Sequence, residues 1–122
     1  MDRDRPPDVL TDLAAWVHRR CGFLIWAHPF RYGRKVSPAW LDELPIDGIE
    51  IASSNMDLQM GEAALSVAEL YGLKTFVNSD AHRQASLGCY GNDFEADITT
   101  MDQLIDYLNG DDLAGSKIGT GL

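Results

Sequence analysis

Five apolar residues, Phe-Leu-Ile-Trp-Ala at positions 23–27, follow Gly22 without any alternation of polar and apolar side chains. A strand with one face in solvent alternates, whereas a strand covered on both faces is continuously apolar. This run therefore predicts a short strand buried on both faces, which is typical of a parallel sheet.

The rest of the chain alternates helical patterns with further strands. Gly22 and Gly72 follow two apolar stripes of helical spacing, and glycine is the residue that most often caps a helix at its carboxyl end. Thr100 and Gln103 have the spacing of a capping box, which predicts the start of another helix. The predicted helices cover residues 8–20, 37–44, 60–71 and 100–108, and the predicted strands cover residues 23–27, 46–51 and 73–77.

This alternation predicts an α/β fold with parallel strands. The expected organisation is a flexible lead-in over residues 1–7, one partial α/β domain over residues 8–110, and a loose, glycine-rich tail over residues 111–122. A chain of 122 residues has the size of one ordinary domain.

Charge and composition argue against two classes of binding partner, duplex DNA and anionic membranes. The chain has 10 Lys and Arg against 19 Asp and Glu, a net charge of −9. Proteins that bind duplex DNA or anionic membranes usually present a basic surface, so neither partner is expected. No apolar run approaches the roughly 20 residues that span a bilayer. Cys21 and Cys89 fit no metal-binding spacing, and a reduced cytoplasmic protein is expected.

Polar side chains follow each predicted strand, where parallel α/β folds carry their functional residues. His28 follows the first strand, Glu50 lies near the end of the second, and Asp80 and His82 follow the third. Imidazole and carboxylate groups on one edge are ligands for a divalent metal. An extended Asp80–His82 segment would point both side chains the same way, and Pro29 favours an extended backbone at His28.

Each of these residues also has an ordinary structural interpretation. A single histidine after a strand is often a hydrogen-bonded residue at the rim, and an aspartate often caps the next turn. Glu50 lies in a strand that is expected to be buried, where an unpaired carboxylate is costly. It therefore requires a partner, either a salt bridge or the surroundings of a metal. The excess of acidic residues is likewise either a solvated surface or a set of groups gathered around cations.

Taken together, the motifs resemble those of the PHP family, named for polymerase and histidinol phosphatase. The resemblance rests on Ala-His-Pro at 27–29, Asp-Gly-Ile-Glu at 47–50, and Ser-Asp-Ala-His-Arg at 79–83 with Leu-Gly at 87–88. It covers roughly residues 9–110. It implies the C-terminal part of a distorted (β/α)7 PHP barrel, with a metal cluster at the carboxyl ends of the strands.

The resemblance implies a metal-dependent phosphoesterase, a hydrolase that uses zinc, manganese or iron. Its substrate would be a phosphorylated small molecule or a nucleotide. His28, Asp80 and His82 match metal ligands of the family. Three further residues are candidates for catalysis or substrate contact: Glu50 and Asn55 match positions that line the site, and the charge and position of Arg83 suit a phosphate.

The chain departs from the family pattern in one respect, since it has three histidines and no His-x-His pair. It therefore corresponds to the C-terminal portion of the domain, with exposed sheet edges that favour a partner. That partner would be a second copy of the chain or a complementing N-terminal half-barrel. The alternative is a non-catalytic, truncated relative that completes another barrel, and an unrelated α/β binding domain is a third interpretation.

Overall fold

The computed structural model describes residues 5–31, 38–110 and 119–120. Three parallel strands form one sheet in the order β1-β2-β3, and β4 and β5 form a small antiparallel pair. This confirms the predicted α/β class with a parallel sheet. The strands are β1 (Ile25–Trp26), β2 (Gly48–Ala52), β3 (Lys74–Val77), β4 (Tyr90–Gly91) and β5 (Gly119–Thr120), and the helices are α1 (Leu10–Arg19), α2 (Leu58–Tyr71) and α3 (Met101–Leu108), with 3-10 turns η2 (Pro38–Asp42) and η3 (Gln84–Ser86).

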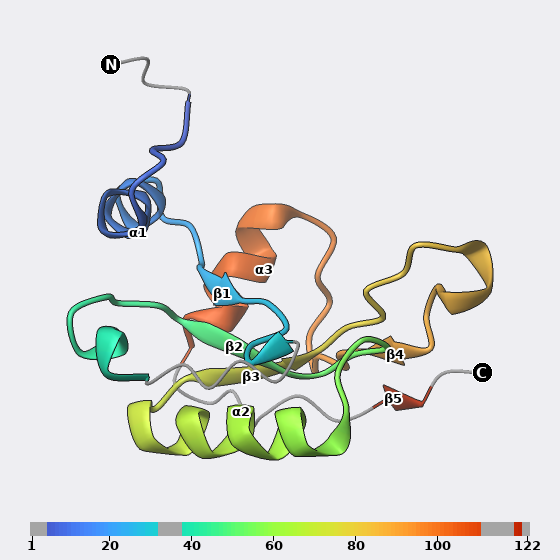
Figure 1. The fold of residues 1–122 in the computed structure, drawn as a ribbon. Helices are drawn as coiled ribbons and strands as arrows, with labels where there is room; N and C mark the ends of the chain where they lie inside the picture. The colour runs from blue at the N-terminus through green and yellow to red at the C-terminus, as the bar shows by residue number, and fades with distance from the viewer. Residues whose placement is uncertain (1–4, 32–37, 111–118, 121–122) are drawn as a thin grey trace.

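Helices α2 and α3 lie on opposite faces of the parallel sheet (Figure 1). The core between α2 and β2 contains Ile49, Ala64 and Ala68, all of which are buried. The two elements approach closely at Gly61, where a Cβ atom would lie 2.6 Å from the Ile51 carbonyl oxygen. A glycine at this position therefore sets the distance between the helix and the sheet.

The predicted helix signals for α2 and α3 are confirmed. Helix α2 ends at Gly72, which adopts a left-handed conformation with φ 65°. At the start of α3, the Thr100 side chain accepts a hydrogen bond from the Gln103 backbone N–H, and the Gln103 side chain accepts one in return. These caps satisfy backbone groups that a helix end leaves without partners.

Helix α1 ends differently from the prediction, which placed the cap at Gly22. Cys21 takes the left-handed conformation, with φ 55°. Gly22 donates its backbone N–H to the Val17 carbonyl oxygen at 2.9 Å. A Cβ atom at Gly22 would lie 2.9 Å from a Val17 methyl carbon. The glycine is therefore required for close approach to the last helical turn rather than for a positive φ.

One aspartate ties α1 to the sheet. Asp47 Oδ2 accepts a hydrogen bond from the Leu24 backbone N–H at 2.7 Å. The same oxygen lies 2.8 Å from His18 Nε2 on α1. Asp47 therefore fixes both the end of α1 and the chain that leads into β1. His18 has this structural role and lies apart from the strand ends discussed below.

A strand does lie within residues 23–27, as predicted, but the prediction that it is buried on both faces is wrong. Strand β1 has two residues, and Ile25 is 38% exposed. The reason lies in its position, because β1 is an edge strand that pairs with β2 on one side only among the described residues. An apolar strand at an edge leaves one side uncovered.

Parts of the predicted organisation fall outside the described residues. Residues 1–4 of the lead-in and most of residues 111–122 are among them. Within the predicted tail, β5 is described and pairs with β4. The sequence analysis predicted neither of these two strands. Among the described helices, none has the length and apolar character needed to cross a membrane.

Candidate functional site

The loops after the three parallel strands meet at the carboxyl edge of the sheet. Two hydrogen bonds join the loop after β2 to the loop after β3. Ser54 Oγ donates to the Ser79 carbonyl oxygen at 2.6 Å. Asn55 Nδ2 donates to Asp80 Oδ2 at 2.6 Å. The structure therefore brings Asn55 and Asp80 together, two of the residues that the sequence analysis singled out.

Glu50 is buried, with 4% of its surface exposed, and both of its carboxylate oxygens have partners. Oε1 accepts the backbone N–H of His28 at 2.8 Å. Oε2 accepts Asn78 Nδ2 at 2.6 Å. These bonds satisfy a buried charge that would otherwise be costly. They also connect the ends of β1, β2 and β3 through one side chain.

The backbone at two candidate ligands is not extended, contrary to the prediction. His28 has φ 30° and Asp80 has φ 47°, both in the left-handed region. For residues other than glycine, such conformations cost about 1–3 kcal/mol each and persist where surrounding contacts hold them. At His28 the contact is the hydrogen bond to Glu50, and at Asp80 it is the bond from Asn55. At His28, the contact with Glu50 outweighs the preference for an extended backbone that Pro29 sets.

Electrostatics favour the charged form of Asp80. The hydrogen bond from Asn55 is the main cause that lowers the pKa of this carboxyl group below its ordinary value, and partial desolvation opposes it. Electrostatic interactions with His82, His28 and Arg31 lower the pKa of Asp80 further. Asp80 is therefore a carboxylate at neutral pH, with both candidate histidines near enough to act on it.

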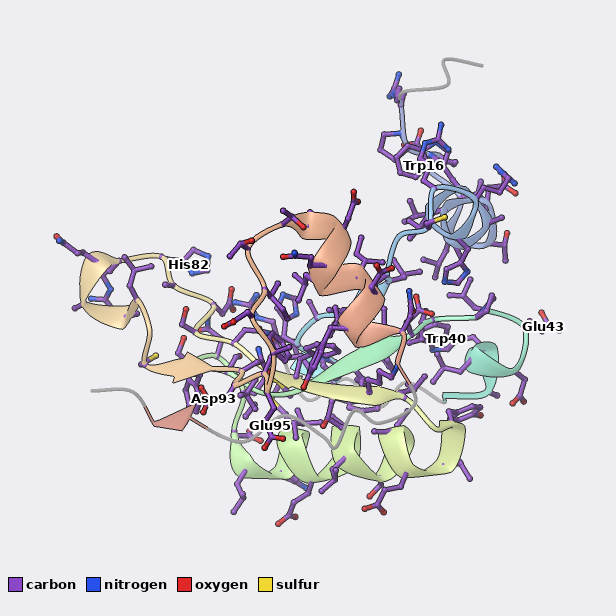
Figure 2. The ribbon with its side chains drawn as sticks, turned by 180° about the vertical axis from the view of Figure 1, so that it is seen from behind. Trp16, Trp40, Glu43, His82, Asp93 and Glu95 are labelled. Atoms are coloured by element: carbon purple, nitrogen blue, oxygen red, sulfur yellow. The ribbon has the colours of Figure 1, made fainter. Side chains whose placement is uncertain are left out.

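His82 lies in the exposed loop after β3, where it is labelled in Figure 2. Its Nδ1 atom is 2.9 Å from the carbonyl oxygen of Asp80. A neutral imidazole that donates from Nδ1 carries its lone pair on Nε2. This tautomer is the one in which Nε2 is free to bind a cation or to accept a proton.

The donor types suit a divalent metal, but they do not converge on one point. Within residues 5–31, 38–110 and 119–120, no group of three His, Cys, Asp or Glu side chains is arranged to hold a metal ion. His28, Asp80 and His82 as placed therefore do not form a complete metal centre. Whether they act as ligands stays a prediction.

Arginine residues lie at two places near these loops. Arg83, predicted to hold a phosphate, is exposed at the start of η3. Arg31 was not singled out from the sequence, yet its charge acts on Asp80. No motif marked Arg31, since it follows the Ala-His-Pro segment without a recognisable pattern.

Sequence reasoning also missed two asparagines. Asn78 donates to Glu50, and its place directly after the third strand was a usable signal. Asn92 Oδ1 accepts the Val77 backbone N–H at 2.9 Å, and Asn92 Nδ2 donates to the Val77 carbonyl oxygen at 2.8 Å. Asn92 comes from a separate turn near β4, so only the folded chain reveals this contact.

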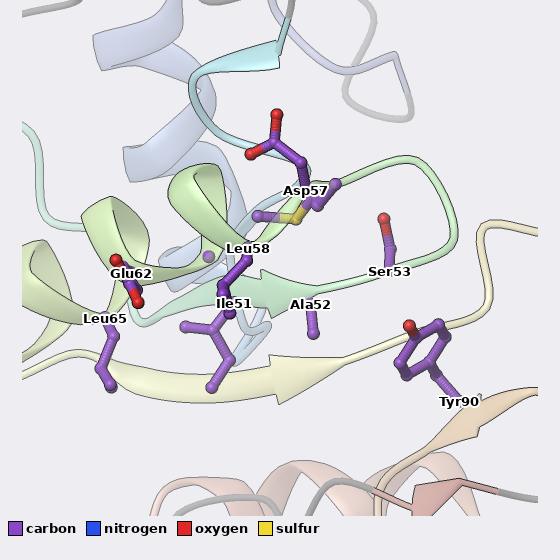
Figure 3. Close-up of a pocket in the computed structure, with 10 residues that line it drawn as sticks. Ile51, Ala52, Ser53, Asp57, Leu58, Glu62, Leu65 and Tyr90 are labelled. Carbon is purple, nitrogen blue, oxygen red and sulfur yellow. The ribbon is translucent and has the colours of Figure 1, made fainter.

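An apolar pocket of about 450 Å³ lies beside the strand ends, between β2, α2 and Tyr90 (Figure 3). Ser53 lines the pocket, and its neighbours Ser54 and Asn55 belong to the loop cluster above. None of His28, Asp80 and His82 is among the described residues that line it. The pocket is therefore adjacent to the candidate site and distinct from it.

A second apolar groove, of about 390 Å³, lies between α1, β1 and η2. Leu13 of α1, Ile25 and Trp26 of β1, and Trp40 of η2 line it. The Trp26 and Trp40 rings pack edge to face with their centroids 4.8 Å apart. The groove thus lies beside the edge strand whose partial exposure was unexpected.

Comparison with known proteins agrees with the resemblance found in the sequence. Residues 62–111 match the family model described as PHP-associated. The match begins within α2, includes Asp80, His82 and Arg83, and ends after α3. This match is consistent with a C-terminal piece of a PHP-related domain. No curated protein and no solved structure matched the chain.

Proposed function

We propose that this chain supplies one part of the active site of a PHP-type metal-dependent phosphoesterase. The observation that carries the proposal is the ionised Asp80, hydrogen-bonded to Asn55 and close to His28 and His82 at the carboxyl edge of the sheet. The match to a PHP-associated model over residues 62–111 supports it, because that stretch includes Asp80 and His82.

In this proposal His28, Asp80 and His82 are ligands to zinc, manganese or iron. Because the described residues contain no three-group metal cluster, further ligands come from outside them. Glu50 and Asn55 hold the ligand-bearing loops in place through the hydrogen bonds already described. The substrate class is a phosphate ester of a small molecule or a nucleotide.

The positive charge that such a substrate requires comes from arginine. Arg31 is near enough to Asp80 to lower its pKa, and Arg83 follows His82 directly in the chain. Guanidinium groups bind phosphate oxygens through paired hydrogen bonds. We assign both arginines to substrate binding, and we place the protein in the cytoplasm, where its two free cysteines remain reduced.

The test is phosphate release from monoesters and nucleotides, measured on the protein purified with every polypeptide that accompanies it under native conditions. Addition of manganese, zinc or iron should produce turnover, and Asp80→Ala should reduce it by about a hundredfold or more. Asp93→Ala, which changes an exposed carboxylate outside these loops, is the matched control. Equal turnover in the wild type and Asp80→Ala would reject the proposal.

One observation favours a second function, that of a non-catalytic subunit which completes a barrel. The apolar groove beside β1 and the 38% exposure of Ile25 suit an additional parallel strand from another polypeptide. Its occupant would be an N-terminal half-barrel on a separate chain, with a second copy of this chain as the other outcome.

Sedimentation of the wild type and of Ile25→Lys distinguishes these cases. A complex lost in the variant supports pairing at β1, whereas a wild type that sediments as a monomer with no companion chain contradicts it.

A further inference from the structure

A chain of hydrogen bonds leads from the turn near β4 to the backbone of His28. Val77 donates to Asn92 Oδ1 at 2.9 Å, and Asn92 Nδ2 donates to Asn78 Oδ1 at 3.2 Å. Asn78 Nδ2 then donates to Glu50 Oε2 at 2.6 Å, and Glu50 Oε1 accepts the His28 backbone N–H at 2.8 Å. Five residues from four separate segments thus form one connected set.

The direction of every bond in this chain is fixed by its two ends. At one end, the Val77 backbone N–H can only donate, so it orients the amide of Asn92 with Oδ1 towards the strand. At the other end, Glu50 accepts from the His28 backbone through Oε1 and from Asn78 Nδ2 through Oε2. The Oδ1 atom of Asn78 then needs a donor on its far side. The Nδ2 atom of Asn92 is that donor.

Burial makes the orientation of Asn78 important. Glu50 is 4% exposed, so water does not readily replace a lost hydrogen-bond donor to its carboxylate. An Asn78 amide turned the other way would place its oxygen against the carboxylate. The buried charge would then be held only from the His28 side, and the contact that stabilises φ 30° at His28 would weaken.

We propose that Asn92 is a positioning residue that fixes the backbone of His28 through Asn78 and Glu50. The assignment deepens the proposed function, on which the role of His28 as a ligand rests. Asn92 Oδ1 accepts the Val77 N–H, while Asn92 Nδ2 donates both to the Val77 carbonyl oxygen and to Asn78 Oδ1. The two bonds to Val77 clamp the end of β3, and the bond to Asn78 is the link to the candidate site.

The variant Asn92→Asp keeps the acceptor for the Val77 N–H but loses both bonds that Nδ2 donates, because aspartate has the same shape and no N–H donor. Since one of the lost bonds goes to Val77 itself, the same substitution is also made in the Asn78→Ala background, where the link to Glu50 is already broken. Amide hydrogen exchange, measured on the metal-free protein, reports on the Val77 N–H and the His28 N–H, which are the two ends of the chain of hydrogen bonds. We expect exchange at the His28 N–H to accelerate by about tenfold in the wild-type background and to change little in the Asn78→Ala background. Asn109→Asp, an exposed change at the end of α3, should alter neither rate.

If Asn92 acts only as a clamp on β3, Asn92→Asp either leaves exchange at His28 unchanged or accelerates it equally in the wild-type and Asn78→Ala backgrounds, and the proposal is overturned. Should Asn92→Asp fail to fold, Asn78→Ala breaks the next link and keeps both bonds between Asn92 and Val77. It carries the same expectation for His28. Retained His28 protection in that variant would reject the proposal equally.

A second readout concerns zinc binding and separates this proposal from the proposed function. Removal of a group that orients a metal ligand typically lowers metal affinity by about 10–100-fold. We expect Asn92→Asp to weaken zinc binding by about tenfold. If the wild-type protein binds no zinc but Asn92→Asp still accelerates exchange at His28, the role of His28 as a metal ligand is rejected. The hydrogen-bond relay from Asn92 through Asn78 and Glu50 to His28 is then retained. Unchanged exchange together with unchanged zinc affinity would reject the relay alone.

Discussion

Two carboxylates, Asp47 and Asp80, show how a single side chain organises this molecule. Asp47 receives hydrogen bonds from the chain before β1 and from His18 of α1. Asp80 receives one from Asn55, and the surrounding positive charges lower its pKa. The two groups lie in different environments and have different consequences. Asp47 contributes mainly to stability, whereas Asp80 belongs to the candidate site.

Replacement of Asp47 by alanine should destabilise the protein. The partly buried Leu24 N–H loses a charged acceptor, and His18 loses its partner. We expect Asp47→Ala to lower the free energy of unfolding by about 2 kcal/mol, measured by urea denaturation. Glu69→Ala, an exposed change on α2, should cost less than about 0.5 kcal/mol. Similar costs for the two variants would contradict the anchoring role.

The pKa of Asp80 should rise towards its ordinary value in Asn55→Ala, because the hydrogen bond that contributes most to the lowering is removed. In the wild type, the lowered pKa stabilises the folded state at pH values above the ordinary carboxyl pKa. That stabilisation is lost as the pH falls through the pKa of the folded protein. An NMR titration of the Asp80 carboxyl carbon measures the change. Ser54→Ala removes a neighbouring loop contact and should leave the pKa in place, so an equal shift in both variants would argue against the specific bond.

Helices and strands differ in how far the sequence determined them. The caps of α2 and α3 are local signals, contained within a few residues, and their predictions are confirmed at Gly72 and Thr100. The environment of β1 depends on which strands pair beside it, so the apolar run at 23–27 gave a wrong prediction of its burial. The backbones of His28 and Asp80 were mispredicted for the same reason, since hydrogen bonds from distant loops hold them.

Close packing of α2 on β2 gives a prediction for one helical position. In Gly61→Ala the new methyl group would lie 2.6 Å from the Ile51 carbonyl oxygen, so the helix must move away from the sheet. We expect a loss of about 1–3 kcal/mol in thermal or urea unfolding, although alanine favours helix more than glycine does. Gly91→Ala is the comparison, because no atom lies within 4 Å of a Cβ there. A stabilised Gly61→Ala protein would show that the contact is not tight.

The whole molecule combines a covered sheet with one open side. Helices α2 and α3 lie on its two faces (Figure 1), while an apolar groove beside β1 stays open among the described residues. The candidate ligands lie in the loops at the carboxyl edge, but no three His, Cys, Asp or Glu side chains in the described part of the chain converge to hold a metal ion. Both observations are explained if the chain is one part of a larger PHP-type active site.

Metal content of the native protein tests this account most directly. Native mass spectrometry with elemental analysis should find stoichiometric zinc, manganese or iron in protein purified without chelator. Asp80→Ala and His82→Ala should lose that metal, whereas Asp93→Ala should retain it. A wild-type protein that stays metal-free after loading with each ion, or an Asp80→Ala variant that keeps its metal, would contradict the account.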